Sequence, residues 1–333
     1  MYRPLNAAIA ACCLAGLGAP ALAQSSVTLY GLMDMSAGQF QTAGTDKVWR
    51  ADSGNMTTSY LGFRGAEDLG GGMKAIFRIE HFLRLDAGAA GRFTTDAFWA
   101  RNAVVGFEGS YGSTTLGRNT TPLFVSTLIF NPLGDSFGFA PSIRHYFLGA
   151  IVGDTGWNNS IRYSGPSLGG ASFNLMANLS EGNGTGKNLG ANVLYFAGPL
   201  AATLAWQSVK NGVFPVPAGF EKQDAWQLGA SYDLKVAKLF GQYGRVKTDA
   251  TAETRTTLVQ LGASVPLAGG SVLASYGNAK AETAGVDSTR KTFTVGYDYF
   301  LSKNTDVYGV VMNDKATGLA GGNTFAIGIR ARF

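Results

Sequence analysis

The last eleven residues of the chain, 323–333, alternate between apolar and polar side chains and end on a phenylalanine. Successive side chains of a strand point to opposite faces, so this segment predicts a strand with one apolar and one polar side. The apolar face would carry Phe325, Ile327, Ile329, Ala331 and Phe333. The polar face would carry Thr324, Gly328, Arg330 and Arg332. We expect such a strand to close a membrane β-barrel by pairing with the first strand, with Phe333 marking barrel closure and assembly.

The same period of two recurs along most of the chain. It is clearest at 27–39, 171–179, 226–233, 259–265 and 292–299. Less regular candidates lie near 57–67, 73–85, 96–108, 113–118, 158–164, 188–197, 200–210, 236–246, 270–280 and 304–313. Together with the terminal segment they make about sixteen strands, an even number as bacterial outer-membrane barrels require. Each has roughly nine to eleven residues, enough to cross a bilayer when tilted.

The expected connections are of two kinds. Short turns rich in glycine or proline fall at 67–72, 109–112, 165–170, 198–199, 266–270 and 301–304. Longer polar loops fall at 40–56, 86–95, 181–187, 211–222, 247–254, 281–289 and 314–322. Short turns on one rim and long loops on the other are typical of an up-and-down barrel. Aromatic residues at expected strand ends suit two interfacial girdles: Tyr30, Trp99, Tyr195, Trp206, Trp226, Tyr299 and Phe333. The pattern predicts an all-β, transmembrane, antiparallel barrel.

Composition supports this fold class. Hydrophobic residues make up 46% of the chain and aromatic residues 12%, whereas charged residues make up only 15% against about a quarter in soluble proteins. A periplasmic β-sandwich or propeller is the competing fold. It fits less well, because about sixteen strands with polar faces suit a wide barrel around an aqueous channel. The net charge of +5 is too small to indicate nucleic acid, and no basic cluster with interleaved aromatics is present.

The N-terminal segment predicts export. Residues 1–23 combine Arg3, a mostly apolar stretch and a small-residue cleavage site at 21–23, as a secretory signal peptide does. The barrel domain would then occupy residues 24–333. A membrane anchor and a lipoprotein signal ending at Cys12 are weaker alternatives. Both cysteines, Cys12 and Cys13, lie in this segment, so the mature chain would have no thiol or disulfide.

One connection is far longer than the others. Nearly forty residues between Arg118 and Asn158 lack a clean strand pattern, and a long loop in a compact fold is usually functional or disordered. This segment carries many apolar residues: Leu123, Phe124, Leu128, Ile129, Phe130, Phe137, Phe139 and Phe147. We expect it to fold into the barrel, bury those side chains against the wall and narrow the lumen.

Taken with this loop, several short motifs resemble one family across essentially the whole mature chain. They are residues 26–31, 61–70, 101–107, 116–119 and 159–163 and the terminal Phe333. In order and spacing they are similar to the general porins of the Gram-negative outer membrane, which are trimeric and sixteen-stranded. The resemblance implies a homotrimer in the lipid bilayer of the outer membrane, forming a water-filled channel for small hydrophilic solutes and ions, with no cofactor.

The resemblance also implies a pore constriction in which loop carboxylates face arginines of the opposite wall. Carried over by position, the wall residues are Arg101 and Arg162, with Arg64, Arg78 and Lys74 nearby. The loop carboxylate is Asp135, or less convincingly Asp154, and Tyr60 stands where the family commonly has another wall arginine. Opposed charges across a narrow neck create a transverse field that sets ion preference. Because the loop is poor in acids, we hypothesise a mild anion preference.

Alternatives remain open at this point. The arginines could be ordinary solvated or salt-bridged lumen residues, or could form a real binding site in a substrate-selective anion porin. An adhesin role for the long loops is more distant. His81 and His145 lie far apart in the sequence with too few acidic neighbours for a metal site, and no nucleophile motif accompanies them, so the sequence indicates neither a metal site nor an enzyme.

Overall fold

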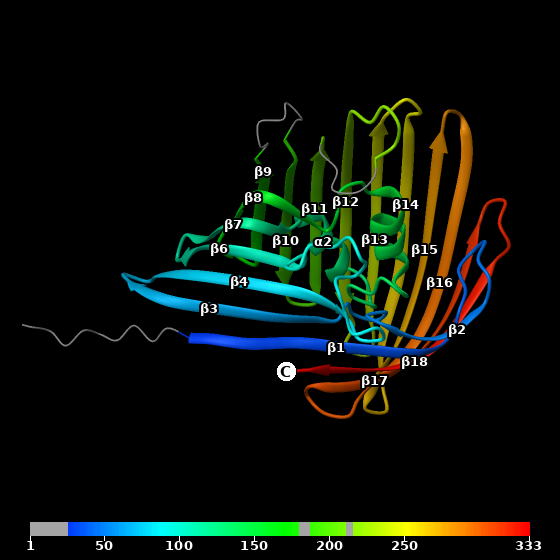
Figure 1. The fold of residues 1–333 in the computed structure, drawn as a ribbon, viewed down its shortest axis with the longest axis horizontal. Helices are drawn as coiled ribbons and strands as arrows, with labels where there is room; N and C mark the ends of the chain where they lie inside the picture. The colour runs from blue at the N-terminus through cyan, green and yellow to red at the C-terminus, as the bar shows by residue number, and fades with distance from the viewer. Residues whose placement is uncertain (1–25, 180–186, 211–215) are drawn as a thin grey trace, which may run out of the picture.

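The computed structural model describes residues 26–179, 187–210 and 216–333, and the predicted signal peptide at 1–23 lies outside them. Sixteen strands form one closed, antiparallel barrel (Figure 1). In sheet order they are β1 (Ser26–Phe40), β3 (Tyr60–Gly70), β4 (Met73–Arg84), β6 (Asn102–Gly109), β7 (Gly112–Thr120), β8 (Gly156–Ser164), β9 (Ala171–Asn178), β10 (Leu189–Ala197), β11 (Leu200–Val209), β12 (Lys222–Asp233), β13 (Lys238–Asp249), β14 (Thr254–Leu267), β15 (Gly270–Thr283), β16 (Val286–Phe300), β17 (Thr305–Ala316) and β18 (Gly322–Arg332). The predicted fold class is confirmed.

The terminal strand closes the barrel. β18 pairs with β1 over eight residues, from Leu32 opposite Arg332 to Gln39 opposite Phe325. Phe333 continues the ladder: its N–H donates to the carbonyl of Gly31 at 3.2 Å, and its own carbonyl accepts from the Gly31 N–H at 3.0 Å. No edge strand is left at this seam, as a structure surrounded by lipid requires.

Along the strands, apolar side chains point outward and polar side chains point inward, as predicted. On β18, Phe325, Ile327 and Ile329 point outward and are 49%, 59% and 47% exposed, while Thr324 and Arg330 point inward and are buried. Inward positions elsewhere are rich in buried amides and hydroxyls, including Gln227, Gln242, Gln260, Thr292 and Thr294. The outside is therefore apolar and the inside polar. No helix in the described ranges is long and apolar enough to cross a membrane.

Several predicted connections were wrong in extent. β15 and β16 are joined by only Ala284 and Gly285, both at positive φ as a tight hairpin requires, and the β17–β18 connection is 317–321. Polar residues such as Lys280 and Asp287, which form a 2.6 Å ion pair, lie on strands instead of in a loop. Strands that extend beyond the bilayer into water carry polar residues on both faces, so polarity there does not mark a loop.

Smaller corrections concern the segments around β4. The segment 40–56 contains β2 (Val48–Ser53), which pairs with the long-loop end of β1, and 86–95 contains the short β5 (Ala89–Ala90). The strand expected at 96–108 begins only at Asn102. Most of the predicted loop 181–187 and part of 211–222 lie outside the described residues.

Two of the predicted girdle aromatics were also wrong. Tyr30 faces the lumen, because it lies opposite Gly62 on the inward face and its hydroxyl donates to Glu80 at 2.6 Å. Trp99 precedes β6 and packs edge-on against His81. The other five lie on outward positions, with Tyr195, Trp206, Tyr299 and Phe333 at least 37% exposed. Tyr30 is an even number of residues from Thr28 and Asp34 and so lies on the same polar face of the strand. The alternation alone therefore predicts that Tyr30 points inward.

The long connection lies inside the barrel, as predicted, and residues 121–155 are called the lumenal loop below. It contains α2 (Pro122–Ile129), α3 (Pro141–His145) and the π-helical turn η1 (Tyr146–Ala150). Figure 1 shows it within the wall, where α2 contacts β10 to β12 and α3 contacts β14 to β16. The loop therefore lines one side of the lumen and leaves the wall formed by β1, β3, β4, β6 and β8 on the other.

Candidate pore constriction

Glycines on the inner wall allow the lumenal loop to lie directly against it. A Cβ on Gly277 would lie 2.6 Å from the Cβ of Pro141, and a Cβ on Gly244 would overlap the hydroxyl of Tyr146. Two further inward glycines meet the loop in the same way, Gly229 at Phe130 and Gly262 at Pro132. These four glycines lie on four consecutive strands, β12 to β15. The wall is thus flattened where the loop rests.

Buried polar side chains then fix the loop to the wall. Asn192 donates to the Ser126 hydroxyl at 2.9 Å, Gln242 donates to the Thr127 carbonyl at 2.9 Å, and Thr294 donates to the Phe139 carbonyl at 2.7 Å. Of the apolar residues predicted to pack here, Leu123, Phe130 and Phe139 are fully buried, whereas Phe137 and Phe147 are only partly buried. A loop with several apolar residues buried and its carbonyls hydrogen-bonded to the wall is a fixed part of the pore lining.

The C-terminal end of the loop is held by an ion network. Both carboxylate oxygens of Asp154 accept from Arg92, at 2.8 and 2.9 Å, and Arg118 pairs with the same carboxylate. Arg92 also binds Asp96 in a 2.8 Å pair. Burial alone would raise the pKa of Asp154, but the hydrogen bonds and charges of Arg92 and Arg118 outweigh it and lower that pKa. Asp154 is therefore an anchor of the loop and does not face the lumen as a free charge.

Three arginines line one cavity of about 470 Å³ on the opposite wall. Arg64 on β3 lies directly opposite Arg78 on β4 in the strand register, and Arg162 on β8 lines the same cavity. The guanidinium of Arg64 lies 5.0 Å from the ring centroid of Tyr30, and Arg162 donates to Asn174 at 2.8 Å. Like charges directly opposite on neighbouring strands are unfavourable for the sheet.

The only carboxylate lining this cavity, within the described residues, is Glu108. Lys74 lies at the short-turn end and is 3.9 Å from the same carboxylate, with both side chains largely exposed. The lining therefore carries a positive excess that no ion pair inside the cavity removes.

Arg101 has a different setting. It precedes β6 and forms a 2.5 Å ion pair with the buried Glu80 of β4. Its guanidinium also covers the ring of Tyr60, 3.8 Å from the centroid. Glu80 accepts in addition from Asn102 at 2.5 Å and from Tyr30. Glu80 was not among the predicted site residues, although it shares the inward face of its strand with Arg78, which was a usable signal.

Asp135 is the acidic residue of the lumenal loop that lies near these groups. It is half-buried, hydrogen-bonds to Thr57 and interacts electrostatically with Arg101 and Arg330. Burial raises the pKa of Asp135, and the positive charge of Arg101 opposes this rise only in part. The structure thus brings Asp135, Arg101 and Tyr60 together, while Arg64, Arg78 and Arg162 form a separate cluster toward the short turns.

Further charged residues that sequence analysis did not select stand on the inner wall of β1 and β16 to β18. Arg330 pairs with Asp298 at 2.6 Å and Asp306 at 2.7 Å, and Arg332 pairs with Asp306 at 2.5 Å. Asp34 accepts from the N–H groups of Met56 and Thr57 at 2.7 and 2.8 Å and so holds the β1–β3 connection. All five residues lie at inward-facing positions of the alternating strand pattern, so the sequence could have placed them on the lumen wall.

Neither histidine is in a catalytic setting. Nε2 of His145 lies 2.8 Å from the Thr292 hydroxyl in a buried contact, and Nδ1 of His81 contacts the carbonyl of Phe98. Across the described ranges, no three or more His, Cys, Asp or Glu side chains gather as a metal site.

Comparison with known proteins gives a consistent result. The family model of the Gram-negative porins matches residues 7–319. Outer membrane porin protein 32 of Delftia acidovorans is 34% identical, over 97% of this chain and 94% of that protein, and an outer membrane porin of Bordetella pertussis is 26% identical over 98% and 99%. Among solved structures, the anion-selective porin from Comamonas acidovorans superposes with a TM-score of 0.81 at 28% identity, covering 93% of this chain and 100% of that one.

Proposed function

This chain belongs to the Gram-negative porin family, and we propose that Arg64, Arg78 and Arg162, together with Arg101 and the nearby Asp135, set the ion preference of its channel. It is an outer-membrane porin, a water-filled barrel through which small hydrophilic solutes diffuse passively. Its lumenal loop and the arginine-bearing wall opposite bound the narrowed part of that path.

The proposed preference is mildly anionic. Its main support is the cavity in which three guanidinium groups are accompanied by one carboxylate, Glu108. Arg101 contributes less, because Glu80 offsets its charge, and Tyr60 adds an aromatic surface without charge. A positive excess in a narrow aqueous path raises the local concentration of anions and lowers that of cations.

The test is a reversal potential across a KCl gradient in a planar bilayer. We expect a potential that corresponds to preferred chloride passage, larger at low salt than at high salt because free ions screen the wall charges. A reversal potential that favours potassium would refute the proposal.

A second candidate is a substrate-selective anion porin in which Arg64, Arg78, Arg101 and Arg162 bind a solute tightly. The shared cavity of three of these arginines favours it. Block of the current by micromolar concentrations of a small organic or phosphate anion would support this candidate. Current that falls only in proportion to millimolar solute would support the passive channel.

The remaining proposals concern the mature assembly. We propose that residues 1–23 are removed on export, that residues 24–333 form a homotrimer, and that the barrel has no enzymatic activity. We also propose that Phe333 is part of the signal for barrel assembly, supported by its place at the closing seam. Mass measurement of the mature protein and conductance steps in multiples of three test the first two.

A further inference from the structure

A second cavity, of about 790 Å³, lies on the long-loop side of the lumenal loop and is separate from the arginine cluster described above. It is bounded by the lumenal loop, the β1–β3 and β4–β6 connections, and Val216 and Pro217. Because long loops of such barrels face outward from the cell, this cavity is a vestibule that an incoming solute meets first. Its volume is in the range of sites for small organic molecules.

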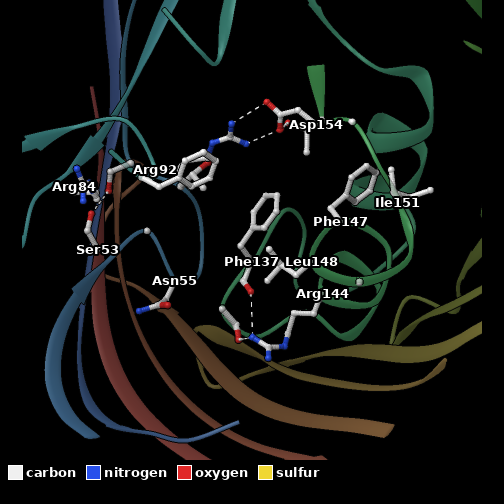
Figure 2. Close-up of a pocket in the computed structure, with 18 of the residues that line it drawn as sticks. Ser53, Asn55, Arg84, Arg92, Phe137, Arg144, Phe147, Leu148, Ile151 and Asp154 are labelled. Atoms are coloured by element: carbon white, nitrogen blue, oxygen red, sulfur yellow. Dashed lines mark hydrogen bonds and ion pairs between the residues drawn. The ribbon is translucent and has the colours of Figure 1, made fainter. Parts of the chain in front are cut away.

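One side of the vestibule is apolar. Phe137, Phe147, Leu148 and Ile151 of the lumenal loop line it, and Figure 2 shows Phe147 and Ile151 on the side opposite Arg84 and Ser53. Leu148 is 58% exposed, and Phe147 is held in place by an edge-on contact with Phe124 at 5.0 Å. An apolar surface that the fold holds open to water is suited to the hydrocarbon part of a solute.

The vestibule also carries uncompensated positive charge. Of its three arginines, Arg92 is neutralised by Asp96 and Asp154. Arg84 forms no ion pair with the described residues; it donates to the Ala90 carbonyl at 3.2 Å, and its buried Nε has no partner there.

Arg144 differs from Arg84 in having a carboxylate nearby, but it shares that carboxylate with another arginine. Its side chain is 10% exposed, its Nη1 donates to the Gly138 carbonyl at 3.0 Å, and its Nε is buried without a partner in the described part of the chain. Asp314, 4.0 Å away, is already bound at 2.5 Å by Arg290. Burial lowers the pKa of Arg144 to about 10, which still leaves it charged at neutral pH.

We propose that this vestibule binds amphipathic organic anions, meaning carboxylates on an aromatic or branched hydrocarbon, with the hydrocarbon on Phe137, Phe147 and Leu148 and the carboxylate on Arg84. Arg144, on the lumenal-loop side of the same cavity, adds positive charge. Arg84 has no carboxylate partner among the described residues, Arg144 shares Asp314 with Arg290, and the buried Nε of each arginine has no partner there, so a carboxylate ligand matches these donors. A small inorganic ion would leave the apolar side unused. The inference rests on the chain being a channel but not on the ion preference proposed for the constriction.

The experiment measures benzoate binding by isothermal titration calorimetry, with the full barrel in nanodiscs and empty nanodiscs as the blank. We expect saturable binding at least about tenfold tighter than that of acetate, which lacks the ring, or benzyl alcohol, which lacks the charge. Arg84→Ala and Leu148→Ser should each weaken benzoate binding by about tenfold. Both side chains lie at a water-filled cavity, so these variants are expected to fold.

Two matched variants serve as controls. Arg255→Ala removes an exposed arginine at the long-loop rim, and Leu319→Ser removes a 56% exposed leucine from the β17–β18 connection. Neither residue lines the vestibule, so benzoate affinity should not change. Absence of saturable binding, or equal weakening by the controls, would overturn the inference. Conductance of the same preparation tests the channel separately from the vestibule site. A barrel that conducts but does not bind benzoate refutes the vestibule site alone. A barrel that does not conduct refutes the channel assignment.

Discussion

Replacing Arg78 by glutamine tests whether the arginine cluster sets ion preference. An ion that passes about 6 Å from the guanidinium gains or loses about 0.7 kcal/mol in water, which screening at 0.1 M salt reduces to about 0.4 kcal/mol. The charge favours chloride and disfavours potassium by this amount, so the two effects add to about 0.8 kcal/mol. Removing it should therefore lower the chloride-to-potassium permeability ratio about fourfold.

The assay is the reversal potential of single channels across a KCl gradient. At about 1 M salt the Debye length falls to about 3 Å, and the same substitution should change the permeability ratio less than twofold. Arg78 faces Arg64 in the strand register, so glutamine relieves a like-charge contact and should not destabilise the barrel.

The matched control is Arg245→Gln. Arg245 lies on an outward position of β13, where it donates to the Tyr243 hydroxyl at 2.9 Å, so its loss changes net charge equally without altering the lumen. A permeability ratio that is unchanged in Arg78→Gln, or that falls equally in Arg245→Gln, would refute the assignment of ion preference to this cluster.

Three further predictions concern the lumenal loop. Gly244→Ala should displace Tyr146 and change the single-channel conductance and noise. The control is Gly241→Ala on the outer face of the same strand, where the new Cβ would lie 3.7 Å from its nearest neighbour, and it should leave both quantities unchanged. Equal effects of the two substitutions would contradict the role of Gly244 in flattening the wall. Asp154→Ala should lower the free energy of unfolding by about 3–5 kcal/mol, because it leaves the buried Arg118 without a carboxylate and removes one of the two carboxylates that bind Arg92. Asp287→Ala, in an exposed pair, should lower it by less than about 1 kcal/mol, and denaturant titration in detergent distinguishes the two. Burial and nearby arginines lower the pKa of His145 to about 4, so as pH falls the imidazole is protonated in the unfolded chain before it is protonated in the folded one. The free energy of unfolding should therefore fall by up to about 3 kcal/mol as pH drops from about 6.5 to 4. A His145→Gln variant with the same pH slope would show that another group is responsible.

Predictions about single strands succeeded where one strand faces lipid on one side and water on the other. Phe325, Ile327 and Ile329 could be assigned to the outside from sequence, because the period of two and the choice of solvent decide it together. Strand ends were less accurate, since residues such as Lys280 are polar whether they lie in a loop or on a strand in water.

The candidate site was predicted only in part. The resemblance placed Arg64 and Arg78 near each other on the inner wall, and the strand register puts them directly opposite each other. The sequence could not show which of these charges lack an ion-pair partner. Arg101 is offset by Glu80, twenty-one residues earlier, and Asp154 is bound by Arg92, sixty-two residues earlier.

Taken alone, the sequence determined the class of fold, the face on which each strand residue lies, and the presence of a long apolar segment inside the barrel. These follow from local alternation and from the length needed to cross a bilayer, which any stretch of ten residues carries within itself. Only the tertiary structure decided which arginines keep a free charge and where the vestibule lies. Ion pairing depends on distances between side chains of separate strands and loops, and closing the barrel brings those groups together regardless of their spacing along the chain.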